Sequence, residues 1–112
     1  MKIAYSRDSL ALQAVRDYKD LPRGAQRNDM KQKALSLWKQ NEDLLTEMDA
    51  TDSTNAFHKR TQLLLVITGL RIQYAQLVFQ DQEEGGHAYD DQIRKINQEI
   101  AALQKESGLG RD

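Results

Sequence analysis

Helix-breaking residues are few in this chain, and their positions limit what it can fold into. It has one proline, Pro22, and six glycines. Between these residues the apolar side chains recur every three or four positions, which places them on one side of an α-helix. The alternation that a half-buried strand needs is absent over a strand's length. The sequence therefore predicts an all-α protein.

Four helices are expected, joined by short turns at the breakers. A turn is expected around Pro22, and Ser6 is a suitable N-cap for the first helix because its hydroxyl can accept from a backbone N–H. Gly85-Gly86 is expected to end the third helix. The predicted helices cover about residues 7–19, 25–49, 54–84 and 88–105.

Short connections favour antiparallel neighbours, so we expect three long antiparallel helices in a bundle or coiled-coil-like arrangement. The short N-terminal helix would pack across them. Residues 1–112 would form a single helical domain, with about 106–112 as a frayed tail. The alternative architecture is an open helical hairpin completed by a second copy or by a partner.

The fourth segment has the cleanest seam, because Tyr89, Ile93, Ile96, Ile100 and Leu103 are separated by four, three, four and three positions. The second segment has a similar seam that is slightly wider and contains one polar residue. Its members are Met30, Ala34, Leu37, Asn41, Leu44 and Met48, with Trp38 and Leu45 on an adjacent row. Asn41 could fix the register of a bundle or could face water at a loose end.

The third segment is apolar on several sides and is the expected central helix. One row contains Leu63, Ile67, Leu70, Tyr74 and Leu77. A second row, formed by Leu65, Ile72 and Phe79, needs cover from the first helix or from another chain. That row is the candidate partner-binding surface. Gly69, inside the segment, could permit close packing or mark a kink.

The formal net charge of −1 conceals strong patterning. Residues 1–39 carry an excess of basic side chains, whereas 40–57 and 81–91 carry only acidic ones. The simplest interpretation is that these blocks pair with one another and fix the helix order. Alternatively, a candidate basic patch at the first turn would bind the phosphates of DNA or RNA. Its members are Arg16, Lys19, Arg23, Arg27 and Lys31.

No catalytic, cofactor or metal site is predicted. The chain lacks cysteine, phosphate-loop and dinucleotide motifs, and its carboxylates lie outside the predicted seams. His87 is followed by Asp90 and Asp91, but a metal site needs several converging ligands. His58 has basic neighbours that would repel a cation. Both histidines are expected to be ordinary surface residues.

These features predict a non-catalytic helical module for protein–protein interaction, such as an adaptor, a chaperone or a regulatory subunit, including a homodimer. The alternative is a nucleic-acid-binding accessory protein that uses the basic N-terminal third. No signal-peptide run begins the chain, and the apolar stretch at 63–70 is too short to span a bilayer. We therefore expect a cytoplasmic protein without a membrane partner.

Overall fold

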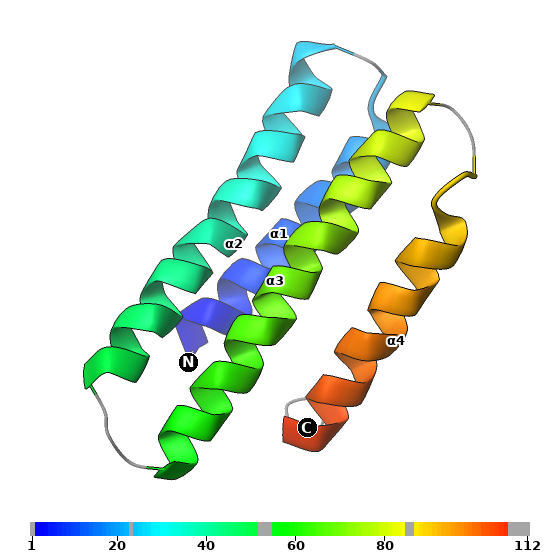
Figure 1. Ribbon diagram of the computed structural model, residues 1–112. Helices are drawn as coiled ribbons and strands as arrows, with labels where there is room; N and C mark the ends of the chain where they lie inside the picture. The colour runs from blue at the N-terminus through cyan, green and yellow to red at the C-terminus, as the bar shows by residue number, and fades with distance from the viewer. Residues whose placement is uncertain (1, 23, 52–54, 85–86, 108–112) are drawn as a thin grey trace.

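The computed structural model describes residues 2–22, 24–51, 55–84 and 87–107, and within these ranges it contains four α-helices and no strand. The helices are α1 (Lys2–Asp20), α2 (Ala25–Thr51), α3 (Asn55–Glu84) and α4 (Asp90–Ser107). Successive helices run in opposite directions along the long axis of the molecule (Figure 1). The all-α class and the antiparallel arrangement are thus confirmed. The expected glycine stop at 85–86 and residues 108–112 of the expected tail lie outside the described residues.

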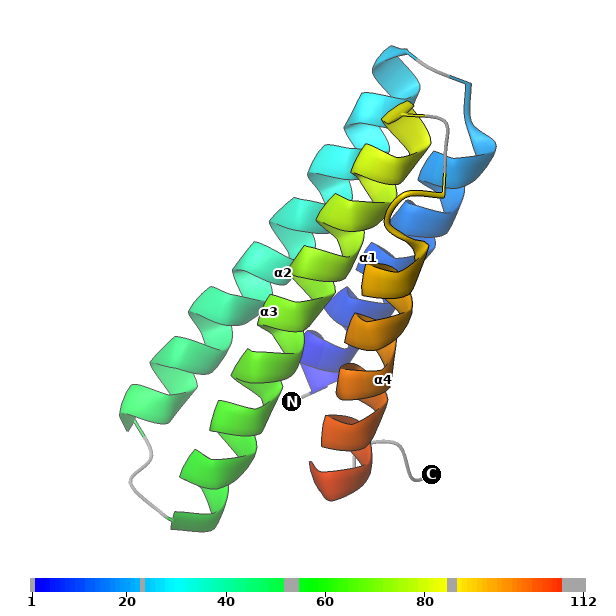
Figure 2. The same ribbon diagram turned by 45° about the vertical axis from the view of Figure 1, so that its right-hand side comes forward.

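The helical core is formed by α1, α2 and α3, and not by the last three helices as the seams had indicated. The most extensive helix–helix contact joins α1 to α2, while α4 approaches closely only α3 among the described helices. Figure 2 shows α4 as a flanking helix beside α3. The prediction of a short first helix lying across a bundle was therefore wrong, because α1 is one of the helices that enclose the core.

The first helix begins at Lys2, so Ser6 lies inside α1 and is not its N-cap. The contact of Ala4 with α2 explains why α1 has an N-terminal turn more than expected. Ala4 is 5% exposed, and its carbonyl oxygen accepts a hydrogen bond of 2.9 Å from Nδ2 of Asn41 in α2. Small side chains at Ala11 and Ala14 are also buried, which lets α1 lie close to α2.

The buried row of α2 coincides only in part with the predicted seam, from which it takes Ala34 and Asn41. Ala34, Trp38, Asn41 and Leu45 are fully or almost fully buried. Other members of the predicted seam, such as Leu37, are only half-buried. The buried stripe thus lies between the predicted seam and the adjacent row of Trp38 and Leu45, and it keeps the seven-residue spacing.

A polar contact ties the three core helices together at Asp8. Its Oδ1 accepts a hydrogen bond of 2.8 Å from Nε1 of Trp38 in α2 and forms an ion pair of 3.2 Å with Nε of Arg71 in α3. Both charged side chains are largely covered, with 28% of Asp8 and 13% of Arg71 exposed. Such a bridge specifies which helices are neighbours, since either charge alone would be costly to bury.

The central helix, α3, contacts all three other helices, as predicted. By length and composition, its segment His58–Glu84 could also cross a membrane, although the shorter run at 63–70 could not. This is weak evidence for a span, because the core helix of a bundle meets the same criteria. A Cβ atom at Gly69 would have no neighbouring atom within 4 Å, so close packing of the helices does not require a glycine here.

Candidate functional site

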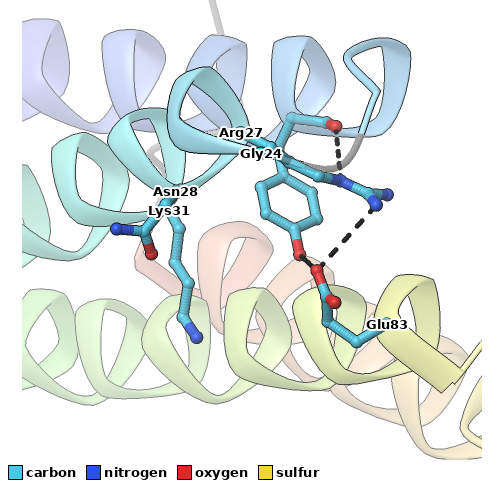
Figure 3. Close-up of a pocket in the computed structure, with 6 residues that line it drawn as sticks. Gly24, Arg27, Asn28, Lys31 and Glu83 are labelled. Atoms are coloured by element: carbon cyan, nitrogen blue, oxygen red, sulfur yellow. Dashed lines mark hydrogen bonds and ion pairs between the residues drawn. The ribbon is translucent and has the colours of Figure 1, made fainter.

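A pocket of about 280 Å³ lies where the end of α1, the start of α2 and the end of α3 meet. Figure 3 shows Arg27 and Lys31 extending from α2 on one side, and Glu83 extending from α3 on the other. The pocket is lined by Tyr18, Gly24, Arg27, Asn28, Lys31 and Glu83. Its lining therefore combines two cations, a carboxylate and a phenol.

Arg27 is the centre of this pocket, and only 7% of it is exposed. Its Nε donates to the Tyr18 carbonyl at 3.2 Å, and its Nη2 donates to Oε1 of Gln82 at 2.9 Å. Its Nη1 lies 3.9 Å from Oε1 of Glu83. The guanidinium group thus joins all three core helices, and its donors are directed at groups of the protein itself.

The phenol of Tyr18 completes the network from the other side. Its hydroxyl donates to Oε1 of Glu83 at 2.7 Å and lies 3.4 Å from the carbonyl oxygen of Phe79. The Tyr18 and Phe79 rings are in contact, with centroids 4.5 Å apart. Nζ of Lys31 lies 5.9 Å from the Phe79 centroid, at the edge of cation–π range. This arrangement fixes the three helix ends in place, so the pocket's polar groups have a structural use.

The described members of the predicted basic patch differ in how far they are exposed. Arg16 and Lys19 are exposed on α1, whereas Arg27 is buried and Lys31 is half-buried against α3. Arg23 lies outside the described residues. Arg27 is engaged with Gln82 and Glu83, and phosphate binding by these residues stays a prediction.

The predicted apolar row of α3 is divided between the core and its edge. Phe79 is 1% exposed and belongs to the main core cluster, against which Ile72 also packs. Leu65 is half-buried. Phe79 is covered by Tyr18 of α1, which is the first of the two kinds of cover expected for this row, and partner binding by the row stays a prediction. Apolar side chains that do face water lie elsewhere: Ile3, Tyr5 and Leu10 on α1, and Val66 on α3.

A second cluster lies where α3 ends and α4 begins. Asp81, His87 and Asp90 each place one potential ligand atom within 4.8 Å of the others. Nδ1 of His87 is 3.0 Å from Oδ2 of Asp90. Near this cluster, a hydrogen bond with Glu84 raises the pKa of the Tyr89 phenol, with smaller contributions from desolvation and from the charges of Glu84 and Asp81.

Asp81 is the residue that sequence reasoning missed, since no carboxylate was expected within an apolar seam. It is 8% exposed, and its Oδ1 has no hydrogen-bond partner among the described residues. A signal was present in the sequence. Asp81 continues the row of Leu70, Tyr74 and Leu77, four positions after the last of these. The row's spacing therefore places it on the face that α4 covers.

Comparison with known proteins gives no relative: no family model matches the chain, and no curated protein or solved structure is significantly similar to it.

Proposed function

We propose that the protein is a non-catalytic interaction module that binds an amphipathic helix of a partner protein along the outer side of α1. The observation that carries this proposal is the exposure of Ile3 and Leu10, which leave 58% and 50% of their surfaces in water. They are seven positions apart, so they lie on one stripe of the helix. An exposed apolar stripe on a well-packed helix is a docking feature when it is continuous.

The charge along this stripe favours a particular kind of partner. Arg7 lies between Ile3 and Leu10 in the sequence, four positions after one and three before the other, and is half-buried. A basic side chain between two apolar ones complements a helix that carries an acidic residue between two apolar anchors. We therefore assign the partner as an amphipathic helix with an acidic residue on its apolar side.

The titratable groups of the Arg27 pocket support a non-catalytic role. A catalytic acid or base must reach a substrate, whereas Arg27 donates to protein oxygen atoms and Tyr18 donates to Glu83. For Arg27 or Tyr18 to act on a substrate, these hydrogen bonds would first have to break, and breaking them in a buried network costs free energy.

The test compares Leu10→Lys with Gln13→Lys, a matched control that adds the same charge to an exposed position of the same helix. Circular dichroism should show both variants folded, because both positions face water. Affinity capture on the immobilised chain should retain a helical partner that Leu10→Lys loses and Gln13→Lys keeps. Light scattering after size exclusion identifies the case in which that partner is a second copy.

Two results would contradict the proposal. One is a chain that remains a monomer and captures no protein that distinguishes the two variants. The other is a captured protein that both variants lose equally, since this would point to the added charge and not to the apolar stripe.

A further inference from the structure

We propose that Asp81, His87 and Asp90 form a binding site for a divalent transition-metal ion of the zinc class, at the corner between α3 and α4. One imidazole and two carboxylates are a ligand set that Zn²⁺ accepts, with water in the remaining position. This site is separate from the α1 surface and does not depend on the proposed interaction.

The geometry carries the first part of the argument. The three potential ligand atoms lie within 4.8 Å of one another. In a tetrahedral zinc site, ligand atoms about 2.0–2.2 Å from the metal lie roughly 3.4 Å apart, so contraction by at most about 1.4 Å would close the site. The two outer ligands can move, because the side chains of His87 and Asp90 are 88% and 56% exposed.

Asp81 carries the second, independent part. It is 8% exposed at the α3–α4 contact, and its Oδ1 has no hydrogen-bond partner among the residues that the structure describes. A covered carboxylate oxygen without a donor is costly, since burial disfavours the charge unless something compensates it. A metal ion held by the neighbouring His87 and Asp90 would supply that compensation.

The surrounding charge also favours a cation. Residues 81–91 contain five acidic side chains and no lysine or arginine. Two nearby arginines have partners: Arg94 is paired with Asp91, and Arg27 lies against Glu83. Neither of these ion pairs involves Asp81 or Asp90, and the partner of Asp90 is His87, the third proposed ligand.

The site can be tested with Zn²⁺ by calorimetry and with Co²⁺ by visible absorption, using the metal-free full-length chain. We expect one equivalent of Zn²⁺ per chain and a visible Co²⁺ spectrum. His87→Ala and Asp81→Asn should each weaken Zn²⁺ binding by about tenfold or more. His58→Ala is the matched control, because His58 also pairs with an aspartate, its Nδ1 lying 2.6 Å from Asp49, yet it belongs to no three-ligand cluster in the described chain.

Asp81→Asn also separates loss of binding from loss of folding. Without metal, this variant should melt at the same temperature as the original chain or higher, because it removes an uncompensated covered charge. Added Zn²⁺ should raise the melting temperature of the original chain by more than that of Asp81→Asn at the same Zn²⁺ concentration. Three results would overturn the proposal: no Zn²⁺ uptake by the original chain, full-strength binding by Asp81→Asn, or an equal loss of binding in His58→Ala and His87→Ala.

Discussion

The guanidinium carbon of Arg27 lies 4.4 Å from the centroid of the Tyr18 ring, and its Nε donates to the Tyr18 carbonyl oxygen. One side chain of α2 thus covers the ring of Tyr18 and completes the hydrogen bonding of the last turn of α1. The same side chain reaches Gln82 in α3. This cation therefore contacts all three helices that meet at this end of the bundle.

Replacing Arg27 with methionine should lower the free energy of unfolding by about 1–3 kcal/mol. The change keeps an aliphatic stem but removes the guanidinium's hydrogen bonds to the Tyr18 carbonyl and to Gln82, and the Tyr18 carbonyl keeps the 3.4 Å bond from the Leu21 N–H. Arg16→Met is the matched control, because Arg16 is exposed and has only a 3.4 Å hydrogen bond to Gln13. Urea unfolding measures both variants, and equal losses would show that Arg27 does not hold the helices together.

Asn41→Asp should destabilise the chain by about 2–4 kcal/mol at neutral pH, because it replaces a buried donor to the Ala4 carbonyl with a charge. Burial raises the pKa of the new carboxyl above its unfolded value. The protonated acid can donate to that carbonyl. The loss of stability should therefore be smallest at pH values below the unfolded pKa and should grow as pH rises from the unfolded pKa through the folded pKa.

Gln40→Glu makes the same amide-to-acid change at an exposed neighbour of Asn41 and should leave stability nearly unchanged. Thermal melts of both variants across the acidic range provide the comparison. If Asn41→Asp were harmless at neutral pH, Asn41 would have to face water.

Phe79→Ala should lower the free energy of unfolding by about 3–5 kcal/mol, since it leaves a cavity beside Tyr18. Leu65→Ala, on the same predicted row, should cost roughly half as much or less, because Leu65 is only half-buried. Chemical denaturation of the isolated chain distinguishes the two. If both variants lost equally little free energy of unfolding, Phe79 would not be a core residue and its predicted contact with a partner would be favoured.

Gly69→Ala should raise the free energy of unfolding by about 1 kcal/mol, because alanine favours the helix and its methyl group would meet nothing within 4 Å. Gly24→Ala also has open space around it, but it should lower stability by about 1–2 kcal/mol. Its φ of +148° is a conformation that residues with a side chain rarely adopt. Thermal melts should therefore move in opposite directions, and a common direction would refute this assignment.

The helices themselves were predictable because their ends are set by local chemistry. Pro22 separates α1 from α2, and α2 begins at Ala25 as the pattern predicted. The spacing of Ile93, Ile96 and Ile100 similarly identified α4. The start of α1 was not predictable from capping, since its first turn is stabilised by the tertiary hydrogen bond between Ala4 and Asn41.

The candidate sites were harder to predict, because charge patterning counts side chains without saying which of them face the bundle. Arg27 seemed equivalent to Arg16, yet it lies seven positions before Ala34 and so on the buried row of α2. Asp81 was overlooked for the opposite reason. It lies in a block of acidic residues that looked like a solvated rim, although its spacing from Leu77 places it under α4.

The position of α4 has a further consequence for binding at the centre of the bundle. Because α4 contacts only α3 among the described helices, another helix could reach the covered face of α3 only by displacing α4. The short connection to α3 keeps α4 at an effective concentration of roughly millimolar. Any competing helix would have to overcome that local excess to reach this face of α3.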